Sequence, residues 1–247
     1  MKRLTIVSAV LCLSLLASGC TTKAKTLTSE THAPANGTAM SEAQNSQAVN
    51  GQHDVKVEDL SKDNYTDSNN DTYTSVYPKL IVDGKEAAEI NESLRDYIKK
   101  TYPIKVETEY GITEGFETSY KWAVKGNIVS IVIHVSGICS DYFTNEAFNY
   151  DLDTLKPLDD SEVVKRLGMT DEAFFGKTSD ILKKECKDIG DYDLDKTLAS
   201  VNYDNITPFI TSDGKTGVVA GIYYAADSQF GGMVSVRGFN LETGERV

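Results

Sequence analysis

The sequence has few of the residues that build metal and redox centres, with only three histidines and four cysteines among its 247 residues. Their spacing fits no zinc site, which takes four such ligands, usually in short paired motifs. Basic residues are also scarce, since 25 lysines and arginines stand against 37 aspartates and glutamates, a net charge of −12. Nucleic-acid binding depends on neutralising phosphates with lysine and arginine, so this balance argues against that class of partner.

Long hydrophobic runs are absent except near the N-terminus, where residues 4–17 form an apolar stretch after two basic residues. This stretch is shorter than the roughly 20 residues that a membrane-spanning helix needs. A basic start, an apolar core and small residues before a cleavage point are typical of an export signal. Cys20 follows Ala-Ser-Gly at 17–19. The segment resembles the lipobox of bacterial lipoproteins, although Ala17 replaces the usual leucine.

The lipobox resemblance implies that residues 1–19 are a signal peptide. It also implies that Cys20 becomes the acylated first residue of a mature chain, carrying fatty acids such as palmitate. The chain would then be anchored in the cell membrane and face the outside or the periplasm. An ordinary secretory signal with a chance cysteine is the alternative. The mature chain would carry 23 bases against 37 acids, a net −14, and would therefore contact the anionic bilayer through its acyl chains alone.

Residues 20–54 are predicted to be a flexible tether between the lipid and the folded domain. The segment contains no aromatic residue and is dominated by small and polar side chains. Such a composition cannot bury enough apolar surface to offset the entropy of ordering. A random coil of this length spans about 30 Å, which would lift the domain off the lipid surface. Two of the three histidines, His32 and His53, fall in this predicted tether.

The folded domain is expected over residues 55–247, centred on a β-hairpin. Residues 116–124 alternate apolar and polar side chains, and residues 128–135 form a β-branched apolar run. A short turn, Lys125–Asn127, separates them, which is typical of a hairpin.

Other elements follow from periodicity and turn residues. A helix is predicted over Asp83–Lys100, with Asp83 and Glu86 forming a capping box, and two more helices over Asp160–Leu167 and Thr170–Lys187. Residues 63–71 and 188–195 are predicted loops. Further strands are predicted over residues 75–82, 104–110, 147–156, 206–211, 217–224 and 233–240. The order βα-βββ-αα-βββ indicates an α+β domain, a largely antiparallel sheet with helices packed on it.

Two cysteines remain once Cys12 leaves with the signal and Cys20 is acylated. Cys139 ends the central strand and Cys186 lies on the apolar face of a predicted helix. Outside the cytoplasm two such thiols can form a disulfide. The alternative is two separate buried thiols that behave as small apolar side chains.

Several short motifs resemble an extracytoplasmic module of two halves, here about residues 74–140 and 141–247. The motifs are Tyr77-Pro78-Lys79, Ile90-Asn91, Phe148–Thr154, Lys156-Pro157-Leu158, Asp213-Gly214 and Gly231-Gly232. This family includes the outer domain of lysozyme-sensing anti-sigma factors of Gram-positive bacteria, the non-catalytic domain beside some peptidoglycan deacetylases, and many uncharacterised lipoproteins. Leu155 replaces the usual turn glycine, and residues 223–232 follow the family pattern only loosely. The resemblance implies a non-catalytic module whose loops decide partner binding.

Catalytic and calcium-binding patterns are weak. His134 lies two residues before Ser136 on the central strand, but no third group completes a triad in the sequence, and a lone histidine on a strand is more often a packed residue. Residues 67–71 and 191–195 have the acidic 1-3-5 spacing of an EF-hand. Both lack the glycine at position 6 and the glutamate at position 12. We therefore expect no enzyme, no cofactor and no metal site.

Aromatic residues supply the candidate binding surface. Tyr223, Tyr224 and Phe230 flank a glycine-rich loop near the end of the chain. Tyr120 and Trp122 on the central hairpin would stack on sugar faces if exposed, or pack on the core helix if buried.

The sequence thus predicts a cell-envelope lipoprotein that acts as a binding or sensing module. Its acidic charge favours a cationic wall-acting protein such as lysozyme as the first partner to consider. Peptidoglycan is the second. The rival hypothesis is a wall-modifying hydrolase or a deacetylase accessory enzyme.

Overall fold

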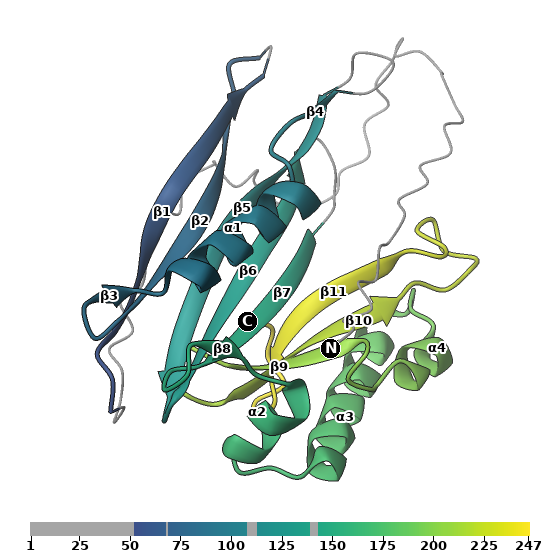
Figure 1. The fold of residues 1–247 in the computed structure, drawn as a ribbon. Helices are drawn as coiled ribbons and strands as arrows, with labels where there is room; N and C mark the ends of the chain where they lie inside the picture. The colour runs from purple at the N-terminus through teal and green to yellow at the C-terminus, as the bar shows by residue number, and fades with distance from the viewer. Residues whose placement is uncertain (1–51, 68, 108–112, 139–142) are drawn as a thin grey trace. The chain divides into compact units, whose positions relative to one another are not determined.

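The computed structural model describes residues 52–67, 69–107, 113–138 and 143–247, all within one compact unit, residues 43–247. They form two β-sheets and four helices (Figure 1). The larger sheet contains β1 (Val55–Thr66), β2 (Thr72–Val82), β3 (Lys85–Glu86), β4 (Val106–Glu107), β5 (Thr113–Lys125), β6 (Ile128–Ile138), β7 (Phe143–Asp151) and β8 (Lys156–Pro157). The smaller sheet contains β9 (Ile206–Ile210), β10 (Thr216–Tyr223) and β11 (Val234–Asn240). The helices are α1 (Ala88–Thr101), α2 (Asp160–Arg166), α3 (Asp171–Ile189) and α4 (Leu194–Ala199).

The content is mixed α and β, and most neighbouring strands run antiparallel. The larger sheet has the order β1-β2-β5-β6-β7-β8, with β3 beside β2 and β4 beside β5. The smaller sheet has the order β11-β10-β9. The predicted order of elements is matched only in part, because β1, the short strands β3 and β8, and α4 were not expected, whereas β4 falls within the predicted strand over residues 104–110.

The predicted central hairpin is confirmed. β5 and β6 pair antiparallel in a continuous register from Gly115 and Ile138 to Lys125 and Ile128, and Gly126 takes the turn at a φ of 59°. β7 pairs with the other edge of β6, so β6 is an interior strand.

Both faces of β6 are covered, which explains why its sequence is a continuous apolar run rather than an alternating one. Val129, Ile131 and Ile133 belong to the core beneath α1. Ile128 and Val132 point the other way and pack against residues of α2, β9 and β10.

α1 begins five residues later than predicted, and the expected capping box is wrong. Asp83 has a φ of 52°, a turn conformation that cannot start a helix, and Lys85 and Glu86 pair with β2 instead. The observed N-cap is Ala87, which makes no side-chain capping hydrogen bond. Ile90, Leu94 and Ile98 nevertheless form one buried apolar stripe, and the helix lies across one face of the large sheet (Figure 1).

One strand pair departs from the antiparallel expectation. β2 and β5 run parallel, and the only bridge between them joins Ser75 to Thr118 among the described residues. Side chains help to hold the seam: Ser75 Oγ donates to Phe116 O at 2.8 Å and Thr118 Oγ1 donates to Val76 O at 3.2 Å. A parallel neighbour arises because α1 carries the chain back between the two strands.

The two later helices were predicted closely. Thr170 caps α3 by accepting a hydrogen bond from Ala173 N at 3.2 Å, and Gly190 ends the helix at a φ of 78°. Two predicted loops were partly wrong. Residues 63–66 belong to β1, and α4 begins at Leu194 because Asp193 accepts from Lys196 N at 2.9 Å and caps it.

A buried polar network joins the two sheets. Ser130 Oγ donates to Asn149 Oδ1 at 2.5 Å, and Asn149 Nδ2 donates to Pro208 O at 2.7 Å. Ile210 N in turn donates to Ser130 Oγ at 2.9 Å. These bonds satisfy polar atoms that would otherwise be costly to bury, and they fix where β9 sits against β6 and β7.

Candidate functional site

Two connections that are distant in sequence pair at one end of the smaller sheet. Ala225 N donates to Asp191 O at 2.9 Å, and Asp193 N donates to Tyr223 O at 2.8 Å. An isolated bridge also joins Tyr192 and Tyr224. The α3–α4 connection and the β10–β11 connection therefore form one surface, residues 189–196 and 223–234, which we call the aromatic tip.

Aromatic rings form the centre of the aromatic tip. The centroids of Tyr192 and Tyr224 lie 4.8 Å apart at 59°, and those of Tyr224 and Phe230 lie 5.1 Å apart at 52°. The Lys196 ammonium lies 4.5 Å from the centroid of the Tyr223 ring, a cation–π contact. Of the three residues that the sequence singled out, Tyr224 and Phe230 are in ring contact, whereas the ring of Tyr223 contacts Lys196.

The cluster rests on a charged support that the sequence did not reveal. Arg237 donates to the Tyr192 hydroxyl at 3.1 Å and its guanidinium lies 3.7 Å from Glu185. Arg246 binds the same Glu185 carboxylate. Burial, followed by the hydrogen bond with Tyr224, raises the pKa of Tyr192 to about 12, so its hydroxyl stays protonated at neutral pH. These contacts hold Tyr192 in place beneath the more exposed rings.

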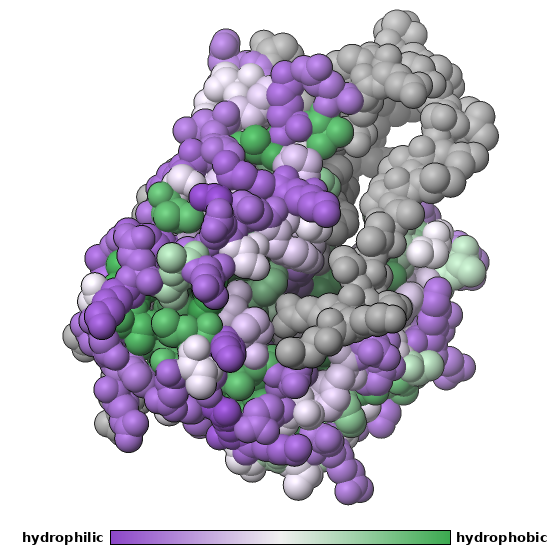
Figure 2. Space-filling model, in the orientation of Figure 1, coloured by the Kyte–Doolittle hydropathy of each residue, from purple (hydrophilic) through white to green (hydrophobic). Residues whose placement is uncertain are grey.

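Four large apolar side chains of the aromatic tip are exposed. The exposed fractions are 40% for Ile189, 39% for Leu194, 50% for Met233 and 37% for Val234. Figure 2 shows hydrophobic colouring at the outer end of the β10–β11 connection, at the right of the view. Scattered exposed apolar residues need no explanation, whereas four within two paired connections that also hold an aromatic cluster are typical of an interaction site.

Glycine fixes the shape of the β10–β11 connection. A Cβ at Gly231 would lie 2.4 Å from Ala226 O, and Gly232 has a φ of 83°. Met233 N donates to Phe230 O at 2.9 Å within the same turn. The loop is thus held by its own backbone bonds.

The rim of the aromatic tip is acidic. Residues 189–196 and 223–234 contain four aspartates and one lysine. Asp191, Asp195 and Asp227 are exposed, and the fourth, Asp193, caps α4. The tip therefore combines an apolar centre with a negative surround.

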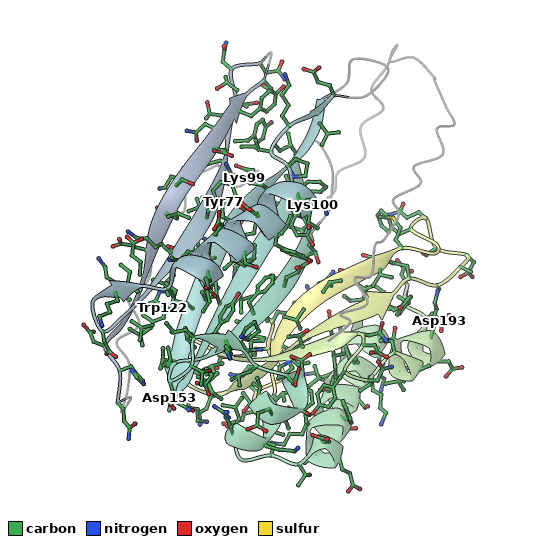
Figure 3. The ribbon with its side chains drawn as sticks, in the orientation of Figure 1. Tyr77, Lys99, Lys100, Trp122, Asp153 and Asp193 are labelled. Carbon is green, nitrogen blue, oxygen red and sulfur yellow. The ribbon has the colours of Figure 1, made fainter. Side chains whose placement is uncertain are left out.

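The hairpin aromatics lie elsewhere and are packed. Trp122 is 6% exposed and belongs to the core of the larger sheet (Figure 3). Burial and the hydrogen bond from its hydroxyl to Asp59, 2.9 Å, raise the pKa of the half-buried Tyr120. For both residues the structure supports packing, the alternative that the sequence left open, over sugar stacking.

His134 is also a packed residue. Its Nδ1 lies 2.5 Å from Asn145 Oδ1, and within the described residues its buried Nε2 has no hydrogen-bond partner. Burial lowers its pKa. The adjoining cavity, lined in part by Trp122 and Phe209, has a volume of about 10 Å³. That is room for one water molecule and not for a substrate.

The acidic runs are engaged locally. Asp67 Oδ1 accepts backbone hydrogen bonds from Asn69 at 2.8 Å and from Asp71 at 2.9 Å. In the part of the chain that the structure describes, no group of three or more histidine, cysteine or acidic residues is placed to hold a metal ion.

The structure describes only some of the remaining predicted site residues. Cys186 is a buried free thiol, while Cys139 and Cys20 lie outside the described residues. None of the helices within the described ranges is long and apolar enough to cross a bilayer.

No protein-family model and no curated protein matches this chain. The resemblance to the extracytoplasmic module over residues 74–240 therefore stays a prediction.

Proposed function

We propose that the chain is a non-catalytic, lipid-anchored binding module of the cell envelope whose aromatic tip docks a cationic protein. The observation that carries the proposal is that two paired connections expose four large apolar side chains and also hold the ring cluster of Tyr192, Tyr224 and Phe230. Aromatic and methionine side chains are enriched at the centres of protein interfaces, surrounded by a polar rim.

Charge selects the class of partner. The rim of the tip is acidic, and the whole chain carries −12. A cationic protein would be steered toward such a surface, whereas an anionic one would be repelled. A wall-acting enzyme of the lysozyme type is cationic. It would also meet this chain in the cell envelope, where the chain is predicted to be anchored.

The binding test uses the full chain in detergent, immobilised, with egg-white lysozyme as the probe. Replacing Leu194 and Met233 together by serine should weaken binding at least about tenfold, which corresponds to about 1.4 kcal/mol, mainly through faster dissociation. Phe143→Ser is the matched control, because Phe143 is 64% exposed on β7, outside the tip. It should bind as the wild type does.

A set of charge-removing variants distinguishes long-range electrostatic attraction from direct contact with the partner. Asp191→Asn, Asp195→Asn and Asp227→Asn together should slow association at low salt, and the difference should shrink near 0.15 M salt, where the Debye length is about 8 Å. Asp180→Asn, an exposed site on α3, is the control. Cytochrome c, an unrelated cationic protein, should bind at least about tenfold more weakly than lysozyme. Equal binding of lysozyme and cytochrome c would show that the attraction is nonspecific electrostatics, and it would overturn the proposal.

Two further measurements address the rival hypotheses. Incubation with insoluble peptidoglycan should release no sugar or acetate, since any turnover would contradict the non-catalytic assignment. Membrane anchoring is tested by detergent phase partitioning. The wild type should enter the detergent phase and Cys20→Ser should not, because the serine cannot be acylated.

A further inference from the structure

His53 lies between two carboxylates that come from different turns. Its Nδ1 is 2.8 Å from Asp83 Oδ2, in the turn between β2 and β3, and its Nε2 is 2.9 Å from Asp153 Oδ1, in the turn between β7 and β8. The His53 side chain is 18% exposed. The sequence placed this residue in the flexible tether, two positions before the first strand.

Further bonds tie these groups to the backbone and to a third turn. Asp54 N donates to Asp83 Oδ1 at 2.9 Å, and Asp83 N donates to Asp54 O at 2.8 Å. Asn127, in the β5–β6 turn, donates through Nδ2 to Asp153 Oδ2 at 2.8 Å. We call the set His53, Asp83, Asn127 and Asp153 the His53 clasp. It joins the start of the domain to three turns of the larger sheet.

The arrangement is satisfied by only one protonation state of the histidine. A neutral imidazole carries one N–H and one lone pair, whereas an imidazolium carries two N–H donors. Ionised carboxylates accept hydrogen bonds and cannot donate them. With a carboxylate facing each nitrogen, a neutral His53 would place one lone pair against a negative oxygen. The protonated form makes two charge-assisted hydrogen bonds.

We propose that the His53 clasp is a pH-sensitive latch that holds the start of the domain against the turns of the larger sheet and opens when His53 loses its proton. Opening would release His53 and Asp54 from the turns that hold them. The domain would then begin at β1, and no longer at His53. The clasp lies apart from the aromatic tip, since Asp153 and Asp193 are on opposite sides of the view in Figure 3. The proposal therefore does not depend on the proposed docking function.

The charges around the clasp define its working range. Hydrogen bonds to Asp153 and to Asp83 raise the pKa of His53 above 6.5, and the same bonds lower the pKa of each carboxyl. Lys85 lies near Asp83 and lowers its pKa further, whereas Asp151 acts on Asp153 in the opposite sense. A raised histidine pKa stabilises the closed form fully below pH 6.5, and this stabilisation is lost as pH rises through the pKa of the folded state. Protonation of the carboxyls sets the lower limit, below their ordinary pKa of 3.8.

A histidine titration tests the protonation step. NMR of the full chain in detergent, with ¹⁵N-labelled histidine, follows only three imidazoles. His53 should titrate above 6.5, and Asp153→Asn should lower its pKa because an amide can face either imidazole nitrogen without repulsion. Asp180→Asn, an exposed carboxylate on α3, is the matched control and should leave the titration unchanged. A His53 pKa at or below 6.5 would overturn the proposal.

Amide hydrogen exchange tests the opening step. Protection of the Asp83 amide, which donates to Asp54 O, should fall as pH rises from 6.5 through the folded-state pKa of His53, by up to about tenfold for each pH unit, and should level off above that pKa, after correction for intrinsic exchange. The Ala87 amide, which donates to Leu80 O outside the clasp, is the internal reference and should show no such fall. In His53→Gln the Asp83 amide should be weakly protected at every pH. If the wild-type protection ratio of the two amides stays flat through the titration, the clasp does not open and the proposal fails.

Discussion

Asn91 of α1 forms hydrogen bonds with both backbone groups of Leu80 in β2. Leu80 N donates to Asn91 Oδ1 at 2.7 Å, and Asn91 Nδ2 donates to Leu80 O at 3.1 Å. Both residues are buried. One amide side chain thus stands in for a neighbouring strand and fixes the helix on the sheet. The same asparagine belongs to one of the motifs on which the family resemblance rests.

Asn91→Ala should therefore destabilise the domain strongly. The substitution leaves the buried Leu80 N–H without its partner and deprives the carbonyl of one donor, at a cost of about 1–3 kcal/mol for an unsatisfied group. We expect a loss of about 2–4 kcal/mol in the free energy of unfolding, measured by urea denaturation. Glu92→Ala, the next position on the exposed side of the helix, is the control and should change it by less than about 0.5 kcal/mol. A loss below about 1 kcal/mol for Asn91→Ala would contradict this role.

Local signals in the sequence located much of the fold. The turn at Gly126 and the β-branched run after it identified the central hairpin, and the apolar periodicity of residues 170–187 located α3 within two residues of its ends. These elements were predictable because the residues that start, stop and bury them are close together in the chain.

Other features depend on contacts between distant segments. Asp83 and Glu86 have the spacing of a capping box, yet pairing of Lys85 and Glu86 with β2 prevails over it. Residues 63–66 are too polar to suggest a strand, but they gain a ladder partner in β2. For the candidate site, the three aromatic residues of the β10–β11 connection were identified, whereas Tyr192 and Arg237 join them only through tertiary packing. The His53 clasp, built from residues up to 100 positions apart, gave no local signal.

Leu155 should be a site of backbone strain. It has a φ of 53°, in the left-handed region that a leucine side chain disfavours and that glycine adopts readily. Its side chain is exposed, so little packing is lost on its removal. Leu155→Gly should raise the free energy of unfolding by up to about 1 kcal/mol, partly offset by the greater freedom of glycine in the unfolded chain. Leu155→Ala retains a Cβ and should bring no such gain in stability, measured by thermal or urea unfolding. Equal gains for the two variants would show that the effect comes from removing the leucine side chain and not from relieving backbone strain.

The buried Asp151 should make stability depend on acid pH. Burial alone would raise the pKa of Asp151, but hydrogen bonds from Arg166 and from the backbone and side chain of Thr154 outweigh it and hold the pKa below 3.8. A lowered carboxyl pKa contributes stability above the unfolded pKa and loses it as pH falls through the folded one. Arg166→Gln should therefore cost about 2–3 kcal/mol at pH 7, and the difference from wild type should shrink below about pH 3.

Urea unfolding at both pH values provides the measurement for Arg166→Gln. Arg95→Gln is the matched control, because Arg95 pairs with Asp96 on the exposed side of α1. Exposed pairs contribute about 0–1 kcal/mol, so this variant should lie close to the wild type at both pH values. A cost for Arg166→Gln that is the same at pH 7 and pH 3 would show that packing, and not the ionised Asp151, explains the effect.

Cys186 should be a free but unreactive thiol in the native protein. It lies on the buried face of α3, and burial raises its pKa above the ordinary value of 9.0, which lowers the thiolate fraction available for alkylation. Native alkylation should be more than about a hundredfold slower than in denaturant, since opening a core helix costs at least about 3 kcal/mol. Peptide mapping after labelling in denaturant without reductant distinguishes the two alternatives for this cysteine. A label on Cys186 indicates a free thiol, whereas labelling that requires prior reduction would indicate a disulfide with Cys139.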